Sequence, residues 1–260
     1  MPTNAPAAAQ ALSLLRLLAR HTAPMPAAAI ARDLALPRSS VYHLLAVLRE
    51  QGFVVHLPDE RRYGLGVAAF ELGSAYTRQA PLQRLARPLL HRLADASTHS
   101  AHLAVLHGRD VLYVIEERAI RRPPLVTDVG VRLPAHLTAS GLAMLAALPA
   151  AQVRAIFPSK DAFVQRNDDG TTGSTGPTSL PELRRRLVAV RQHGFAVENG
   201  SVTPGFASVA AAALDHNGHP VAGIAVTYPA AELSAAEAEA LVDLVTRSAA
   251  DLTRRIHGRR

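Results

Sequence analysis

Five side chains that can donate hydrogen bonds cluster at the start of one short predicted helix in the first fifth of the chain. They are Arg38, Ser39, Ser40, Tyr42 and His43, and all lie off the apolar face of that helix. Donors at a helix N-terminus suit phosphate oxygens and base edges in the major groove of DNA. Ser39 and Ser40 also lie in the first turn, where free N–H groups and the helix dipole favour a phosphate.

A second basic element follows closely. The sequence predicts a strand over residues 53–57 and a turn over residues 58–60. Arg61 and Arg62 then begin the return strand. An arginine pair at a hairpin tip suits a phosphate backbone or a minor groove. Either element alone could be a solvated surface, but the two in register favour a DNA contact.

Apolar spacing predicts the helices that must hold these side chains. The repeat i, i+3, i+4, i+7 occurs in three consecutive segments: Ala11, Leu14, Leu15, Leu18; Ala27, Ile30, Ala31, Leu34; and Val41, Leu44, Leu45, Leu48. Pro37 separates the second and third helices, and Gly52 ends the third. We therefore predict a winged helix-turn-helix DNA-binding domain over residues 1–66.

Residues 67–79 predict a further helix with Ala69, Leu72, Gly73 and Tyr76 on one face, and Pro81 ends it. An apolar face without a partner in its own domain would pack against a symmetric copy, so we predict a linker and dimerisation helix over 67–80. Packing against its own winged domain is the alternative.

Residues 81–260 predict a mixed α+β domain with an antiparallel sheet. The expected elements are helices over 81–97, 138–148 and 180–193, a hairpin over 102–116, strands over 125–129, 195–198, 206–214 and 220–228, and a last helix capped by Ser234 and Glu237. Residues 158–180 predict a mobile loop rich in Asp, Gly and Thr.

Two of these strands share a face of small side chains, which indicates a small-molecule pocket. That face carries Ser208, Ala210 and Ala212 on one strand and Val221, Gly223, Ala225 and Thr227 on the other. The alternative is a helix packed closely on an Ala/Gly surface.

Two polar residues could complete the pocket. Ser140 lies in the first turn of its helix, where the hydroxyl and free N–H groups could hold a carboxylate. Glu198, at a strand end, could orient a ligand hydroxyl or could simply be solvated.

Motifs for catalysis and metal binding are absent from the sequence. It has no G-x-S-x-G, H-E-x-x-H, P-loop or G-x-G-x-x-G pattern. The pairs His99/His102 and His216/His219 have metal-ligand spacing without an acid partner, so we interpret them as surface histidines. We predict a ligand-binding module without a metal or cofactor; an enzyme with an appended DNA-binding module, or an architectural DNA binder without a ligand, are the alternatives.

Composition supports this organisation. The 260 residues carry a net charge of +7, which agrees with an anionic partner. There is no cysteine, no signal-peptide pattern and no apolar stretch of membrane-spanning length, so we expect a cytoplasmic protein.

Three stretches together resemble the IclR family of transcriptional regulators. They are LPRSSVYHLLAVLREQGFV followed by RRYGLG, then VRLPAHLTASGLAMLAAL, and finally GFAVENGSVTPGFASVAAAALDHNGHPVAGIAVTYP. The resemblance covers nearly the whole chain. It implies a GAF-like effector domain, homodimers or dimers of dimers, an operator in double-stranded DNA, and control by a small organic or aromatic acid.

Carried over by position, the resemblance implies effector contacts at Ala139, Ser140, Glu198, Ser208, Ala225 and Thr227. The chain departs from the family pattern in four places. Tyr42-His43 stands where His-Arg is common, Glu198 where Asp is common, and Ala225 where a hydroxyl or thiol is common; the Gly/Thr loop is longer than usual.

Overall fold

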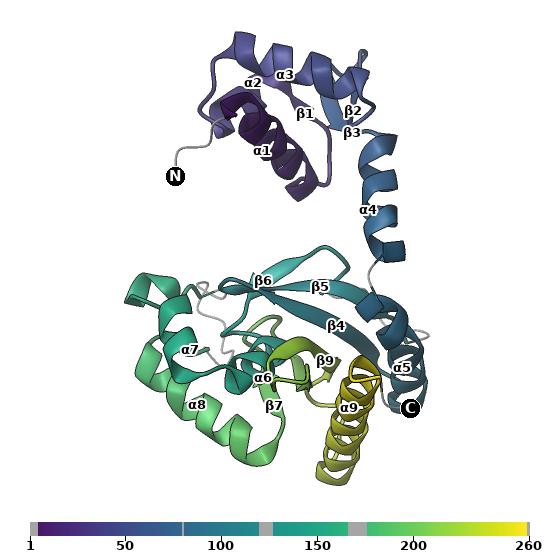
Figure 1. Ribbon diagram of the computed structural model, residues 1–260, viewed down its shortest axis with the longest axis vertical. Helices are drawn as coiled ribbons and strands as arrows, with labels where there is room; N and C mark the ends of the chain where they lie inside the picture. The colour runs from purple at the N-terminus through teal and green to yellow at the C-terminus, as the bar shows by residue number, and fades with distance from the viewer. Residues whose placement is uncertain (1–4, 80, 120–126, 166–175, 259–260) are drawn as a thin grey trace. The chain divides into compact units, whose positions relative to one another are not determined.

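The computed structural model describes residues 5–79, 81–119, 127–165 and 176–258 (Figure 1). The chain divides into two compact units, Met1–Ala80 and Pro81–Arg260. Among the described residues, no helix is both long and apolar enough to cross a membrane.

The N-terminal unit is a winged helix-turn-helix, as predicted. Its elements in chain order are α1 (Pro6–Arg20), β1 (Met25–Pro26), α2 (Ala27–Asp33), α3 (Arg38–Glu50), β2 (Val54–Leu57), β3 (Arg62–Leu65) and α4 (Val67–Gln79). The three strands form an antiparallel sheet in the order β1-β3-β2. This order places the wing hairpin, β2 and β3, beside the short strand that precedes α2.

The apolar repeats form one core among α1, α2 and α3. Leu14, Ile30, Val41 and Leu45 are buried there. Between α2 and α3 the backbone turns at Ala35, which has a positive φ of 53°, and α3 begins directly after Pro37. The residue before a proline is disfavoured in the α region, so the two helices cannot merge.

Glycine at two positions joins the wing to the end of α3. Gly52 has a positive φ of 72° and ends the turn after α3. A Cβ atom at Gly66 would lie 2.2 Å from the Gly52 carbonyl oxygen, so no larger residue fits without moving the backbone. The Gly66 N–H also donates to the Phe53 oxygen at 2.8 Å. The base of the wing is therefore fixed to the end of α3.

The helix α4 spans the residues predicted to be helical, and its large apolar side chains among those described are exposed. Phe70 is 75% exposed and Leu72 is 63% exposed. Large apolar side chains lose favourable free energy when they remain in water. Ala68 and Ala69 are half-buried, and the Ala68 N–H donates to the Gly52 carbonyl oxygen, which joins the start of α4 to the winged domain.

The C-terminal unit is α+β. Its elements are α5 (Pro81–Ser97), β4 (Ser100–His107), β5 (Asp110–Glu117), β6 (Arg132–Pro134), α6 (Ala139–Ala147), α7 (Ala150–Ile156), η1 (Lys160–Ala162), α8 (Leu180–His193), β7 (Ala196–Asn199), β8 (Phe206–Leu214), β9 (Pro220–Pro229) and α9 (Ala235–Ile256).

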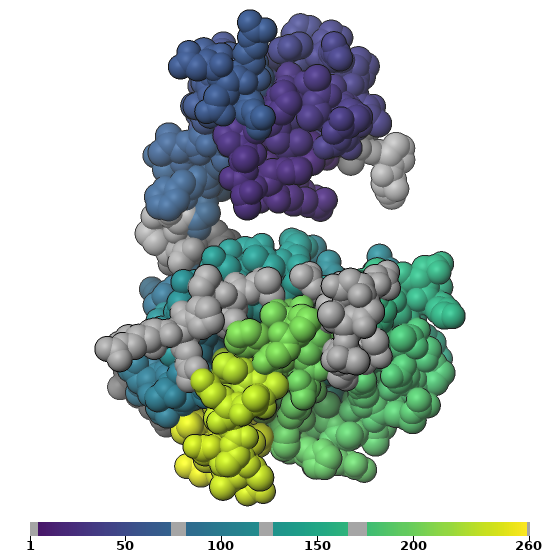
Figure 2. Space-filling model, turned by 180° about the vertical axis from the view of Figure 1, so that it is seen from behind, coloured from purple at the N-terminus to yellow at the C-terminus, as the bar shows by residue number. Residues whose placement is uncertain are grey.

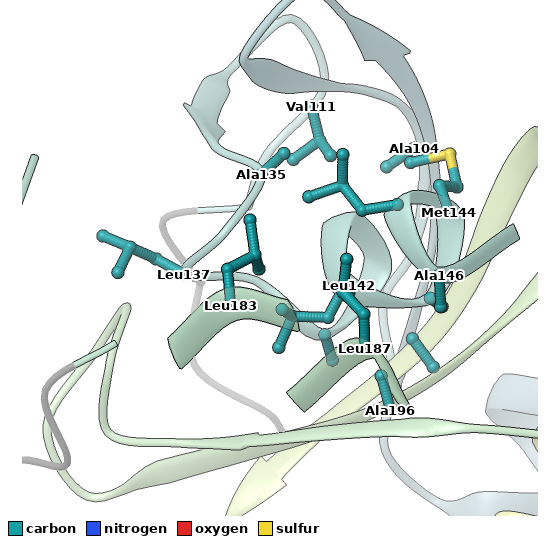
Figure 3. Packing of buried hydrophobic residues seen from close by; sticks show 14 of the residues in the cluster. Ala104, Val111, Ala135, Leu137, Leu142, Met144, Ala146, Leu183, Leu187 and Ala196 are labelled. Carbon is teal, nitrogen blue, oxygen red and sulfur yellow. The ribbon is translucent and has the colours of Figure 1, made fainter. Parts of the chain in front are cut away.

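A six-stranded antiparallel sheet lies between two helical layers in this unit. The strand order is β6-β5-β4-β9-β8-β7. One face packs against α5 and α9, with Ile224 and Val226 in that core. The other face packs against α6 and α8, whose apolar side chains meet those of β4, β5 and β7 (Figures 1 and 3). Figure 2 shows that α9, in yellow, is part of the outer surface of this unit.

Three details differ from the sequence prediction. The strand predicted over 125–129 is wrong in its described part, because residues 127–130 form a turn and the strand β6 starts at Arg132. The helix α7 was not predicted, and η1 lies inside the predicted loop 158–180. Most of the Gly/Thr-rich part of that loop, residues 166–175, lies outside the described residues.

Candidate functional site

The predicted DNA-contacting side chains of α3 lie on one exposed side of that helix. Arg38, Ser39, Tyr42 and His43 are exposed, and Ser40 is half-buried. No side chain caps the N-terminus of α3, and its first turn contains no acidic residue. The start of α3 is thus open to an anion, with several donors beside it.

The two wing arginines have different surroundings. Arg61 has a positive φ of 51° and belongs to the tip of the hairpin. The Arg62 guanidinium donates a hydrogen bond from Nη1 to the Pro24 carbonyl oxygen at 3.0 Å, which ties the wing to the residue before β1. The tip also carries exposed Asp59 and Glu60. Arg61 is therefore the freer cation of the pair, and the acids beside it offset part of its charge.

The six residues implied as effector contacts line one pocket in the C-terminal unit. Its lining, which surrounds a small cavity that is partly open to solvent, consists of Tyr113, Thr127, Thr138, Ala139, Ser140, Glu198, Val202, Thr203, Phe206, Ser208, Ala225 and Thr227. The strands β5, β7, β8 and β9 supply one wall, and the start of α6 supplies another. Residues far apart in sequence are brought together by the sheet order.

Strand register explains why the polar residues meet. Glu198 pairs with Ser208, Ser208 pairs with Thr227, and Thr227 pairs with Ser100, so one row of polar residues crosses four strands. The Ser208 hydroxyl donates to Glu198 Oε1 at 2.9 Å and lies 2.9 Å from the Thr227 hydroxyl. The Ser201 N–H donates to Glu198 Oε2 at 3.2 Å. A ligand at this row would meet a preformed hydrogen-bonded chain.

Glu198 is buried rather than solvated, since only 5% of the residue is exposed. Burial raises the pKa of its carboxyl group to about 7, while hydrogen bonds from Ser208, Ser201 and Val202 lower it. The interpretation of this residue as a solvated strand-end acid is therefore wrong. The turn that follows the edge strand β7 supplies the Ser201 N–H that bonds this carboxylate.

The start of α6 forms the opposite wall of the pocket. Thr138 caps the helix, with its hydroxyl accepting from the Gly141 N–H at 3.0 Å, and Ala139 and Ser140 line the pocket. A Cβ atom at Gly223 would lie 3.0 Å from the Ser140 Cβ, so α6 approaches β9 closely there. The two interpretations of the small-residue face thus apply to different parts of it. The end at Gly223 supports α6, and the end at Ser208 and Thr227 lines the pocket.

Sequence reasoning missed half of the pocket residues. Tyr113 lies within the strand β5, inside the predicted hairpin 102–116, where strand alternation does not distinguish a ligand contact from a core residue. Its pKa is raised by burial and by Glu198, while the hydroxyls of Ser140 and Thr138 lower it. The others missed are Thr127, Thr138, Val202, Thr203 and Phe206. Most of these lie in turns, for which periodicity gives no signal.

The first histidine pair contradicts the sequence interpretation. His99 is buried and His102 is fully buried, because β4 lies in the middle of the sheet with helices over both faces. His102 Nε2 lies 3.4 Å from the hydroxyl of Thr127, a pocket residue. Burial, then the charge of Arg118, lowers the pKa of His102 to about 4. His102 is therefore a neutral histidine behind the pocket wall and not a surface residue.

The second pair behaves as expected, because His216 and His219 are exposed in the turn between β8 and β9. Among the described residues, no group of three or more His, Cys, Asp or Glu side chains is arranged to hold a metal ion.

Family models match both units. The IclR helix-turn-helix domain matches residues 7–58, and the C-terminal domain of the bacterial transcriptional regulator IclR matches residues 74–254. The chain is 30% identical to the HTH-type transcriptional regulator BhcR of Paracoccus denitrificans, over 94% of this chain and 85% of that protein. It is 26% identical to the HTH-type transcriptional repressor AllR of Klebsiella pneumoniae, over 89% of this chain and 82% of that protein.

Solved structures share the fold. An IclR transcriptional regulator from Alicyclobacillus acidocaldarius has a TM-score of 0.83 at 23% identity, with 96% of this chain and 98% of that chain covered. An IclR homologue from Microbacterium hydrocarbonoxydans, crystallised with 4-hydroxybenzoate, has a TM-score of 0.79 at 22% identity, with 97% and 99% covered.

Proposed function

The chain belongs to the IclR family of bacterial transcriptional regulators, and we propose that a small organic acid bound in its C-terminal pocket controls its binding to a DNA operator. The observation that carries this proposal is the convergence of six residues, all inferred from family positions, on one hydroxyl-lined pocket. The pocket faces suit a ligand that both accepts and donates hydrogen bonds.

The DNA-contacting surface is proposed to be the exposed side of α3 together with Arg61 of the wing. Arg38, Ser39, Ser40, Tyr42 and His43 would enter a major groove. Arg61, with Arg62, would contact the flanking backbone. The side chains of α3 would select the sequence, and the arginines would add salt-dependent affinity.

The proposed assembly is a homodimer, or a dimer of dimers, that includes α4 in its interface. The support is the exposure of Val67, Phe70 and Leu72 on this helix. A dimer would present two copies of α3 to successive half-sites. Ligand binding can change operator affinity only if the two DNA-binding states have different affinities for the ligand.

A role in binding is favoured over catalysis. An enzyme would need an acid and a base at the ligand, and the described lining of the pocket offers Glu198 as a carboxyl group and no histidine. His102 is the nearest buried candidate, but it lies behind Thr127 and is not among the residues that line the pocket. We therefore propose that the bound acid leaves the pocket unchanged.

The decisive experiment uses the full-length protein and DNA selected from a random duplex pool. Organic and aromatic acids are then screened for their effect on binding to the selected DNA, measured by fluorescence anisotropy. Thr227→Val keeps the shape of the side chain and removes its hydroxyl, so it should weaken the response to an active acid about tenfold. A full response in Thr227→Val would remove the pocket from the proposal. Arg38→Ala tests the DNA-contacting surface independently, because this variant should lose affinity for the selected DNA.

The dimer has its own test. Phe70→Glu places a charge on the exposed face of α4 and should shift the protein towards monomer in light scattering coupled to size exclusion. Val129→Glu is the matched control, because Val129 is also exposed and lies in a turn of the other unit. An unchanged mass for Phe70→Glu would exclude this face of α4 from the interface.

A further inference from the structure

The pocket holds one carboxyl group and no basic side chain among the described residues that line it. Its other ionisable group is Tyr113, whose pKa is raised above the ordinary tyrosine value and which is neutral at physiological pH. A carboxylate ligand would therefore enter a pocket whose only potential charge is also negative.

Hydrogen bonds to the Glu198 carboxylate come from the Ser208 hydroxyl on β8 and from the Ser201 and Val202 backbone N–H groups in the turn after β7. Thr227 on β9 bonds the Ser208 hydroxyl, and burial, then the charge of Glu198, raises the pKa of Tyr113 on β5 and of Tyr228 on β9. None of these groups carries a positive charge. The nearest buried histidine, His102 on β4, is separated from the pocket by Thr127 and is neutral. The start of α6 carries only the partial positive charge of a helix N-terminus, and no described group in the pocket carries a full positive charge that would offset a second carboxylate beside Glu198.

Two carboxyl groups held this close inside a protein do not both ionise, because the repulsion between like charges in a poorly solvated site raises the pKa of one of them. The cavity is small and Glu198 is part of its lining, so a bound acid lies close to this carboxyl group. The buried position of Glu198 already favours its neutral form. A proton taken from solvent onto the Glu198 carboxylate is therefore the simplest way to admit the acid.

Resting on the proposed function, we propose that an organic acid binds in this pocket only together with one proton, so that the ligand and Glu198 share a single negative charge. In this state Glu198 keeps one oxygen as acceptor for Ser208 and donates its O–H to the ligand. The only bond formed is the O–H bond of Glu198, and the proton comes from water. The expected ligand is thus an organic acid whose affinity for the pocket depends on pH. The affinity of the corresponding uncharged amide should not depend on pH.

The first test is calorimetric titration of the full-length protein between about pH 6 and about pH 8.5. The probes are benzoate and lactate, each with its uncharged amide, benzamide and lactamide. The dissociation constant of the acid should rise towards tenfold per pH unit above the pKa of Glu198, and about one proton should be taken up on binding. The amides should bind with a constant affinity over the same range.

The variant Glu198→Gln keeps a hydrogen-bonding side chain of the same length without a titrating proton. It should bind the acid with no pH dependence in this range and take up no proton. An acid affinity in the wild type that stays constant or increases with pH would overturn the inference and leave the proposed function standing. If neither acid nor amide binds at any pH, the proposed function fails for these ligand classes, and the inference fails with it.

The pH dependence of unfolding, measured without a ligand, is a second test of the inference. Below pH 7 a neutral, buried Glu198 binds a proton that the unfolded chain releases near pH 4.5, so its contribution to stability falls as pH rises from about 5 to about 8. The difference in unfolding free energy between wild type and Glu198→Gln should follow this slope. A difference that does not change with pH would overturn the inference.

Should Glu198→Gln not fold, Ser208→Ala is the second variant, because it removes one hydrogen-bond donor to the carboxylate. The pH above which the affinity for the acid falls should then be higher than in the wild type. An unchanged pH would count against the proposal.

Discussion

The two candidate sites of this protein are built in opposite ways. The DNA-contacting surface consists of exposed side chains on one helix and one hairpin, close together in sequence, with water as their main partner. The pocket consists of hydroxyls and one carboxyl group brought together from segments far apart in sequence, and Glu198, Ser208 and Thr227 are already hydrogen-bonded to one another in a chain. Exposed positions can change without affecting the fold, whereas a change in the pocket alters the core at the same time.

The largest effect should come from the glycines on which each site depends. Gly66→Ala would place a Cβ atom 2.2 Å from the Gly52 oxygen, so the wing must separate from α3. We expect at least about 3 kcal/mol of destabilisation of the N-terminal unit, with loss of operator binding and retention of ligand binding by the C-terminal unit. Chemical denaturation and ligand titration of the full chain measure both.

Two comparisons make this prediction specific. Gly73→Ala is the control for stability alone, because Gly73 lies on the proposed dimer helix; a Cβ atom there meets nothing within 4 Å, so the unfolding free energy should be unchanged or slightly higher. Gly223→Ala should have the reverse pattern, because its Cβ would press on Ser140 at 3.0 Å and displace the pocket wall rather than the wing. If Gly66→Ala weakened ligand binding as much as DNA binding, the two sites would not be structurally separate.

An effect of intermediate size should appear in the pH dependence of stability, where two buried groups of the C-terminal unit oppose each other. The folded pKa of Glu198 is raised to about 7, so its contribution is present at low pH and lost as pH rises from 4.5 to 7. The folded pKa of His102 is lowered to about 4, so its contribution is present above pH 6.5 and lost as pH falls to 4. Each is worth about 3 kcal/mol at most, with opposite sign.

Single variants should reveal the opposed slopes. In Glu198→Gln the unfolding free energy should rise with pH between about 4.5 and 6.5, and in His102→Asn it should fall. The buried His136, whose pKa is also lowered by burial, adds to the slope of His102. Denaturant titrations at several pH values provide the measurement. Parallel pH curves for the wild type and both variants would contradict the assignment of these groups.

The smallest effect should distinguish the two wing arginines. Arg61→Ala should lower the salt dependence of operator binding by roughly one phosphate contact, a slope of about 0.9, without changing stability. Arg62→Ala should in addition cost the N-terminal unit about 0.5–1 kcal/mol, because its hydrogen bond to Pro24 is lost. Operator titrations at several salt concentrations, with thermal unfolding, separate the two. Equal stability of both variants would show that the bond to Pro24 contributes nothing.

Sequence reasoning succeeded where a contact is local. The amphipathic repeats of α2 and α3, the break at Pro37 and the capping box of α9 depend on residues within one or two turns of each other, and all are present. It failed at the strand predicted over 125–129 and at His102. An alternating pattern does not indicate which strand lies in the middle of a sheet. It therefore does not indicate which histidine is buried away from water.

The sequence by itself determined the elements, their order and the exposed donors of α3, because helix and turn formation depend on neighbours along the chain. Only the tertiary structure decided that Glu198, Ser208 and Thr227 form one hydrogen-bonded row, and that Tyr113 and Thr127 join them. Their meeting depends on the strand order β6-β5-β4-β9-β8-β7 and on its register. The same burial gives Glu198 its raised pKa, which no residue adjacent in sequence could supply.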